Sequence, residues 1–307
     1  MMTYELAAIF LGSALRLAAP LLLAATGELV SQKSGVLNTS VEGMMLTGAF
    51  LSAYGSWLTG SPTLGLLIAM IGIIPLSLLQ AFLSITLRSN QLVTGIGINI
   101  LALGGTTLAY REIFGARSNM IVPGLDKWTP FGLGHGTLIG DTIFNQVWLV
   151  YLGLVILILT GIILRYTTLG IAINAVGTAP RAVDQSGLSV AKIRYGAVLF
   201  SGIMSAAAGS LISIGDIHTF TEGMTNGIGF LVIAAIIFGN WKIGRTTLAC
   251  LLFGAASSLQ FQLPLLNIHV PTALLIVLPY LLALLAVAGL IGRQTAPAAL
   301  TQPYQRS

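Results

Sequence analysis

Motifs for enzyme chemistry are missing from this sequence. It contains neither Gly-x-Ser-x-Gly nor His-Glu-x-x-His, and its three histidines lie too far apart to indicate a metal site: His135, His218 and His269. The single cysteine, Cys250, provides neither a disulfide within the chain nor a thiolate zinc site. We therefore expect no catalytic residue, no cofactor and no metal in this chain.

One segment approaches the P-loop pattern that binds nucleotide phosphates. Gly27, Lys33 and Ser34 match this pattern, but Gln32 stands where the second glycine must let the backbone approach a phosphate. No strand-turn-helix context surrounds the segment either. Any ATP that the protein uses must therefore be bound by another chain.

Glu42 is the strongest candidate for a functional polar residue inside the membrane. It lies inside the apolar run 36–58, where an ionisable group is costly and faces protein, a cavity or water. Asn38 lies one helical turn earlier and would share its helix face. The two residues form either a hydrogen-bonded pair facing a pore, or a structural anchor in which the carboxylate caps helix amides. Arg16 is expected to pair with a carboxylate such as Glu42.

The elements that must position these residues are membrane helices. The 307 residues are 55% hydrophobic and 7% charged, against roughly 25% charged in an ordinary soluble domain. The predicted fold is all-α, a polytopic membrane bundle of about 8–10 helices that each cross the ~30 Å hydrocarbon layer. The candidate spans are 6–26, 36–58, 64–87, 91–110, 146–164, 196–215, 222–239, 246–263 and 270–291. The seventh is short enough to be a re-entrant segment instead.

Basic residues indicate how the bundle lies in the membrane. With nine spans, one face receives ten of them: Lys33, Arg88, Arg165, Arg181, Lys192, Arg194, Lys242, Arg245, Arg293 and Arg306. The other face receives Arg111, Arg117 and Lys127. The positive-inside rule therefore places the C-terminus in the cytoplasm and the N-terminus outside. This scatter fits membrane orientation rather than nucleic-acid binding. Residues 1–292 form the membrane domain, and 293–307 are expected to be a solvated cytoplasmic tail.

The two halves of the chain suggest an inverted repeat with an offset of five spans. The second element of each half opens with glycine and polar residues: Gly35, Asn38, Glu42 and Gly43 in one, and Gly223, Asn226, Gly227 and Gly229 in the other. Such paired interruptions indicate a substrate path, here formed by Asn38, Glu42, Asn226, Gly227 and Gly229. Ordinary helix ends in a glycine-rich protein are the alternative.

The loop 166–193 contains a short predicted helix from Ala179 to Ser186. Thr178 can act as its N-cap, Pro180 lies in its first turn, and Gly187 can end it in the left-handed conformation. Its apolar stripe comprises Ala179, Ala182, Val183 and Ser186. Because so short a helix is marginal alone, we expect it to dock, either on a cytoplasmic partner or on its own bundle.

Three segments together resemble a known family. They are Gly27-Glu28 with the Lys33–Asn38 and Glu42–Met45 stretches, the segment from Ala175 through Gly187-Leu188, and Gly227–Gly239 with the later Leu252-Phe253-Gly254 stretch. The chain resembles permeases of bacterial ABC importers for nucleosides, simple sugars and branched-chain amino acids, and is closest to the shorter permease of the nucleoside branch. It departs from the family at Thr178-Ala179, before Pro180, and at Thr39-Ser40.

The resemblance implies a transport subunit without ATPase activity. Its partners would be a second permease, a cytoplasmic ABC ATPase that binds ATP and Mg, and an extracellular solute-binding protein, in a bacterial inner membrane. Coupling to the ATPase would involve Thr178, Ala179, Pro180, Arg181, Ala182, Val183 and Gly187. The solute would be small, neutral and polar, with a nucleoside preferred over a simple sugar. A proton-coupled secondary transporter using Glu42, or a non-transporting scaffold, remains the alternative.

Overall fold

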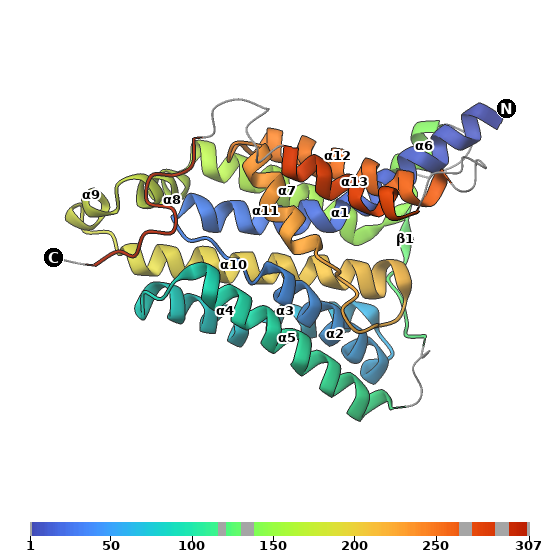
Figure 1. Ribbon diagram of the computed structural model, residues 1–307, viewed down its shortest axis with the longest axis horizontal. Helices are drawn as coiled ribbons and strands as arrows, with labels where there is room; N and C mark the ends of the chain where they lie inside the picture. The colour runs from blue at the N-terminus through green and yellow to red at the C-terminus, as the bar shows by residue number, and fades with distance from the viewer. Residues whose placement is uncertain (1, 116–120, 130–137, 264–271, 286–294, 306–307) are drawn as a thin grey trace.

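The chain folds into a helical bundle elongated along one axis (Figure 1). The computed structural model describes residues 2–115, 121–129, 138–263, 272–285 and 295–305. The first half contains α1 (Met2–Lys33), α2 (Val41–Thr59), α3 (Pro62–Gly72), α4 (Ile74–Ala81), the π-helical η1 (Phe82–Thr86) and α5 (Gln91–Phe114). Two short strands, β1 (Lys127–Trp128) and β2 (Gln146–Val147), pair antiparallel beside α6 (Leu138–Ile143).

The second half begins with α7 (Trp148–Tyr166), α8 (Thr168–Thr178) and the short α9 (Pro180–Gln185). It continues through α10 (Val190–Ser210), the π-helical η3 (Leu211–Ile217), α11 (Ile228–Phe238), α12 (Ile243–Gln262) and α13 (Thr272–Leu285). Helix α9 and the last described residues lie at one end of the long axis, here called the α9 end, and the start of α1 lies at the opposite end (Figure 1).

The predicted all-α membrane bundle is confirmed. Each of the nine predicted apolar runs contains a helix, although the last run is described only in part. Within the described residues, five segments are long and apolar enough to cross a membrane: Ala8–Lys33, Pro62–Thr86, Gln91–Phe114, Trp148–Tyr166 and Val190–Ile217. The seventh run forms only the 11-residue α11, which is too short to span the hydrocarbon layer.

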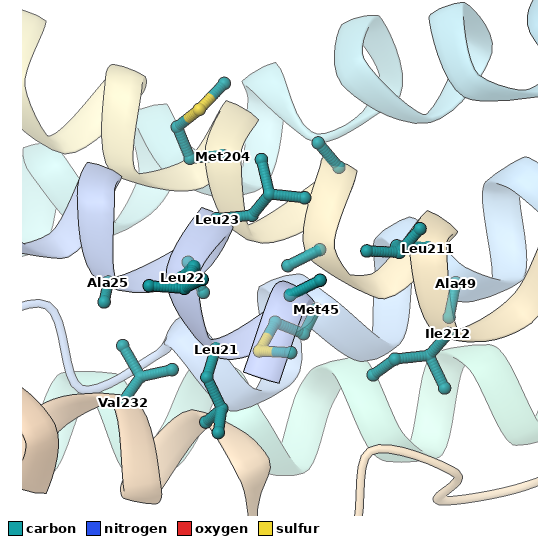
Figure 2. Packing of buried hydrophobic residues seen from close by; sticks show 14 of the residues in the cluster. Leu21, Leu22, Leu23, Ala25, Met45, Ala49, Met204, Leu211, Ile212 and Val232 are labelled. Carbon is teal, nitrogen blue, oxygen red and sulfur yellow. The ribbon is translucent and has the colours of Figure 1, made fainter. Parts of the chain in front are cut away.

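Two long helices, α1 and α10, form the centre of the core. They contact each other along much of their length, with α12 and α2 on their flanks. Figure 2 shows leucines of α1 packed near Met204 of α10, Leu211 of η3 and Met45 of α2. Helix α10 crosses α2 so closely that a Cβ atom on Gly209 would clash with the Met45 carbonyl. Such close backbone approach is how helices pack in a membrane, where small residues replace the hydrophobic drive.

Helix α2 begins later than the sequence predicts. It starts at Val41 rather than at residue 36, and residues 36–38 have no regular structure. Asn38 therefore lies before the helix, and the predicted shared helix face of Asn38 and Glu42 is wrong. Hydrogen bonds to three helices hold the preceding segment in this form. Asn38 donates to Glu28 of α1 and to Ser201 of α10, and the Thr39 hydroxyl donates to the Gln91 carbonyl of α5.

Most of the described residues of the tail, 295–305, are exposed, but part of the tail also bonds to the bundle. Ala299 is 4% exposed and donates its backbone N–H to the Gly177 carbonyl over 2.8 Å. Thr301 donates to the Gly35 carbonyl over 3.2 Å, and the buried Arg194 donates from Nη1 to the Gln302 carbonyl over 3.2 Å. These bonds tie residues 299–302 to α8, to the segment before α2 and to α10.

Candidate functional site

The start of α11 is capped by Glu42, which lies in the first turn of α2. Oε1 of Glu42 accepts the Thr225 hydroxyl over 2.7 Å and the Gly227 N–H over 2.8 Å, and Oε2 accepts the Gly229 N–H over 2.7 Å. Backbone N–H groups at a helix N-terminus have no partner within the helix and carry partial positive charge. The carboxylate thus satisfies three donors and is stabilised without a basic side chain.

Backbone conformation makes this capping geometry possible. Gly227, the residue before α11, has φ +86°, a left-handed conformation that glycine adopts without strain. A Cβ atom on Gly229 would clash with the backbone of Glu42, so the two helix starts meet at van der Waals distance. The structure therefore brings together Glu42, Gly227, Gly229 and the backbone of Asn226 from the two predicted interruptions.

A cavity of about 390 Å³ lies beside this junction. Its polar lining residues are Glu42, Asn99, Thr225 and Asn226. The rest of its lining is apolar or glycine: Gly43, Leu46, Ile96, Ile100, Leu103, Gly223, Gly227 and Phe230. Asn99 of α5, which sequence analysis missed, accepts the Gly43 N–H over 2.8 Å and donates to the Thr39 carbonyl over 3.0 Å. Asn99 therefore fixes the start of α2 against α5.

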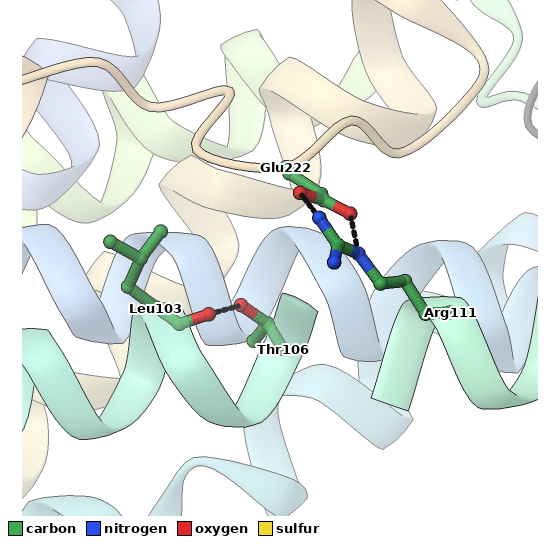
Figure 3. Close-up of polar contacts among 4 residues, drawn as sticks. All are labelled: Leu103, Thr106, Arg111 and Glu222. Atoms are coloured by element: carbon green, nitrogen blue, oxygen red, sulfur yellow. Dashed lines mark hydrogen bonds and ion pairs between the residues drawn. The ribbon is translucent and has the colours of Figure 1, made fainter. Parts of the chain in front are cut away.

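An ion pair lies next to the cavity residue Gly223, in the loop before α11 (Figure 3). Arg111 of α5 donates from Nε to Oε1 of Glu222 over 2.7 Å and from Nη2 to Oε2 over 3.0 Å. The hydrogen bond from the Arg111 guanidinium, and then its charge, lower the pKa of the Glu222 carboxyl below its ordinary value. This bidentate pair ties the end of α5 to the loop that leads into α11.

Asn38 belongs to a second, fully buried polar cluster centred on Glu28 of α1. Oε1 of Glu28 accepts the Asn38 backbone N–H over 3.0 Å and the Gln32 amide over 2.9 Å. Oε2 accepts the Ser201 hydroxyl over 2.9 Å, and Ser201 in turn accepts the Asn38 side-chain amide over 3.1 Å. Trp241 donates its indole N–H to Gln32 over 2.7 Å. Asn38 thus serves the packing of α1 and α10 and does not line the cavity beside Glu42.

Arg16 pairs with a carboxylate, as predicted, but its partner is Asp216 and not Glu42. Arg16 Nη1 lies 3.3 Å from Oδ1 of Asp216, at the η3 end of the α10 helix. Both residues line a wide cavity of about 610 Å³ near β2 and the start of α1, together with Lys127 and His218. Arg16 reaches Asp216 because α10 and η3 run beside α1, whereas Glu42 is satisfied by α11.

The short helix in the inner loop forms with small changes to its predicted bounds. The helix begins at Pro180 rather than at Ala179, so Pro180 lies in its first turn as predicted. Gly187, directly after the C-cap Ser186, has the predicted left-handed conformation with φ +86°. Thr178 is not its N-cap: it is the last residue of α8 and its hydroxyl donates back to the Asn174 carbonyl over 3.0 Å. Ala179 occupies the cap position without a side-chain bond.

The predicted apolar stripe of this helix divides between two environments. Val183 is 6% exposed and packs against Val176 of α8 and Val190 of α10, with Tyr304 of the tail beside them. Five of the other predicted coupling residues are exposed: Thr178, Ala179, Arg181, Ala182 and Gly187. Val183 therefore docks α9 on its own bundle, and only the exposed residues remain open to a partner.

Within the described part of the chain, no three His, Cys, Asp or Glu side chains are grouped closely enough to hold a metal ion.

The fold and its junction of two helix starts define a multi-pass helical membrane protein with a polar cavity against interrupted helices. Residues 10–287 match the family described as "Branched-chain amino acid transport system / permease component". The chain therefore belongs to this family of transport permeases.

Curated relatives extend over nearly the whole chain. It is 35% identical to the guanosine ABC transporter permease protein NupQ of Bacillus subtilis, over 98% of this chain and 97% of NupQ. It is 31% identical to the putative glucose ABC transporter permease protein TsgC13 of Haloferax volcanii, over 98% of both chains. It is also 25% identical to the guanosine ABC transporter permease protein NupP of Bacillus subtilis, over 80% of this chain and 72% of NupP. No solved structure matches the chain.

Proposed function

We propose that this permease moves a nucleoside into the cytoplasm of a bacterium as one half of the membrane pore of an ABC importer, with a simple sugar as the second substrate class. The cavity beside Glu42 carries the proposal, because the starts of α2 and α11 meet there. Amides of α11 donate to Glu42 and the Gly43 amide of α2 donates to Asn99, and both side chains line the cavity. Paired interrupted helices of this kind form the substrate sites of many transporters.

The lining of the cavity suits a neutral solute with one polar and one apolar face. Glu42 already accepts three hydrogen bonds, so its oxygens are occupied by the protein's own donors and the amides of Asn99 and Asn226 are the other polar side chains that a solute would meet. Phe230 is 48% exposed at the cavity and offers a flat apolar surface to a base or a sugar ring. The nucleoside preference follows the similarity to NupQ, and the sugar alternative follows the similarity to TsgC13.

A second permease would complete the cavity. The wall that α5 contributes is open, since Ile96 and Ile100 are 52% and 67% exposed beside the polar residues. NupQ and NupP of the same organism are both named guanosine ABC transporter permease proteins, and this chain is similar to each. We therefore infer a heteromer with a longer second permease whose surface faces α5.

The energy source would be a cytoplasmic ABC ATPase that binds ATP and Mg and contacts the exposed residues around α9, namely Thr178, Ala179, Arg181, Ala182 and Gly187. An extracellular solute-binding protein would deliver the substrate to the opposite end. Membership of a permease family whose relatives are ABC transporter subunits disfavours the proton-coupled secondary transporter.

Uptake into proteoliposomes tests this function. We expect the chain, co-reconstituted with its partner permease, ATPase and binding protein, to accumulate labelled guanosine with ATP, and to do so undiminished by a protonophore. Phe230→Ala should lower this uptake, whereas Phe261→Ala on the exposed face of α12 should not. Uptake that continues without the ATPase and collapses with the protonophore would instead establish the secondary transporter.

Glu42→Gln provides a sharper test of the same site. The glutamine keeps one acceptor oxygen but turns an amide toward the Gly229 N–H, which leaves a donor unsatisfied at a cost of about 1–3 kcal/mol. We expect a lower thermal unfolding midpoint and reduced ATP-dependent uptake. Glu112→Gln, an exposed glutamate of α5, is the matched control and should change neither. Unchanged uptake with Glu42→Gln would remove Glu42 from the substrate path.

A further inference from the structure

An apolar groove of about 420 Å³ lies between α7, α8 and α10. Its walls include Thr160 and Leu164 of α7, Ile173 of α8, and Gly196 and Phe200 of α10. Lys192 is the one charged residue that lines it. The hydroxyl-bearing Thr160 is 6% exposed, so the accessible wall is almost wholly hydrocarbon.

The groove changes in polarity along its length. Lys192 lies in the first turn of α10 at the α9 end, and Phe200 lies eight residues further along the same helix. Eight residues of α-helix rise about 12 Å, so the groove leads from a charged mouth at the α9 end into the apolar depth of the bundle. A phospholipid has this sequence of charge and hydrocarbon along the membrane normal.

The mouth of the groove carries positive charge that no described carboxylate neutralises. The ion pairs among the described residues join Arg16 to Asp216 and Arg111 to Glu222, and neither involves Lys192 or Arg165. Arg165 is exposed in the last turn of α7, next to the groove residue Leu164, and its guanidinium lies 5.2 Å from the Tyr166 ring centre. Basic residues at the membrane surface attract anionic headgroups, and aromatic rings favour the same interface.

We propose that this groove binds an anionic phospholipid from the leaflet at the α9 end, with one acyl chain between α7 and α10 and the phosphate beside Lys192. The charge at the mouth and the apolar lining beyond it favour a lipid as the occupant. A water-soluble partner would contact only the charged mouth and would leave the apolar lining unfilled. The lipid would brace α8 against α10, and α8 leads directly into α9. This inference does not depend on the identity of the transported solute.

Gly196 allows the groove to be filled without disturbing the protein. A Cβ atom on Gly196 would have no other heavy atom within 4 Å, so a leucine there projects into open space in the groove. Gly104 on α5 has the same open surroundings outside the groove, and Gly104→Leu is therefore the matched control. Lys192→Glu removes the charge at the mouth, with Lys242→Glu as a charge control at the start of α12.

The experiment measures phosphatidylglycerol and phosphatidylcholine with identical dioleoyl chains, bound to the purified full chain, by native mass spectrometry and by thermal unfolding. Wild type and Gly104→Leu should bind phosphatidylglycerol in preference and gain stability from it. Gly196→Leu should lose both effects, and Lys192→Glu should bind phosphatidylglycerol about fivefold more weakly or worse, while Lys242→Glu retains it.

Two results would overturn the proposal. The first is wild-type binding of phosphatidylglycerol by a folded Gly196→Leu protein, or an unchanged lipid preference in Lys192→Glu. The second is a Gly196→Leu protein that keeps its phospholipid but loses a co-purifying subunit, since the groove would then hold a protein segment. Lys192 is exposed and its substitution leaves the core intact, so the test stands even where Gly196→Leu fails to fold.

Discussion

The ion pair between Arg111 and Glu222 fixes the loop that positions the α11 N-terminus, and it can be titrated. The pair lowers the pKa of Glu222 below its ordinary value of 4.5. A carboxyl with a depressed pKa contributes stability above its unfolded pKa, and this contribution is lost as the pH falls through the folded pKa. The pair should therefore hold at neutral pH and release only when the pH falls below about 4.5.

This pH dependence can be measured on the thermal unfolding midpoint of the purified protein. We expect Glu222→Gln to unfold at a lower temperature than wild type at pH 7, with the difference lost as the pH falls through the lowered folded-state pKa of Glu222. Arg111→Gln should behave in the same way, and combining the two substitutions should add nothing further. A difference that persists unchanged in acid would mean that the loop is held by contacts other than this ion pair.

Sequence reasoning finds an isolated charge more easily than a polar cluster. Glu42 is detectable because it interrupts an apolar run, and the capping role was one of its two interpretations. Glu28 belongs to the Gly27-Glu28 pair that resembles the permease family, but it lies just beyond the predicted first span. A carboxylate outside a predicted span is expected to be solvated, so the sequence does not mark it as buried. Its partner Ser201 and the more distant Trp241 lie some 170 and 210 residues away in the sequence. Only tertiary contact identifies it as the centre of a buried cluster.

At the scale of elements, helix positions follow from hydrophobic runs, but helix ends depend on neighbours. The first helix extends to Lys33 because Glu28 and Gln32 find polar partners in α10 and at Trp241. The tail, with Pro297 and Pro303, has the composition of a solvated segment. It is nevertheless ordered by carbonyls of Gly35 and Gly177 that no local pattern in the sequence identifies.

The division of α9 into an inward and an outward side leads to an element-scale prediction. Val183→Asp would bury a charge among Val176 and Val190, which we expect to destabilise the protein by about 3 kcal/mol or more and to lower its amount in the membrane. Ala182 is exposed, so the Ala182→Asp protein should fold and accumulate normally in the membrane. It should nevertheless lose the co-purifying ATPase that we propose.

Membrane abundance by fluorescence-detected size-exclusion chromatography, together with ATPase co-purification, separates the two effects. Arg181→Ala provides the matched exposed control and should be mild in both measurements, because an exposed charge contributes little to binding. Normal abundance of Val183→Asp would contradict the packing of α9 on its own bundle. Retained ATPase with Ala182→Asp would exclude this helix from the coupling contact.

At the scale of the whole molecule, two interrupted helices begin away from either end of the bundle and meet at Glu42. Figure 1 shows the segment before α2 coming from the α9 end, whereas the loop before α11 returns from the opposite end. The 19-residue α2 and the 11-residue α11 are thus entered from opposite sides, as the proposed inverted repeat requires. The two ends of the chain also lie at opposite ends of the long axis, which an odd number of crossings produces.

This arrangement assigns each end of the molecule to one side of the membrane. The basic residues of the α9 end, which include Arg181 and Lys192, predict that this end faces the cytoplasm. Thr178 is exposed at this end, and Ile121, which is 82% exposed, lies in the segment that bonds to η3 near the other. Cysteine placed at either position should therefore react from one side only.

Labelling with a membrane-impermeant maleimide tests this orientation in intact cells and in inverted vesicles. We expect Ile121→Cys to react in intact cells and Thr178→Cys only in inverted vesicles, because α10 and η3 together are long enough to separate the two sites by the full bilayer. The native Cys250 is completely buried, so the unsubstituted chain should remain unlabelled in both preparations and a Cys250→Ala background serves as control. Labelling of both positions from the same side would refute the crossing that α7 makes between them. Exchanged sides would place the α9 end outside the cell and would therefore contradict the proposed contact of α9 with a cytoplasmic ATPase.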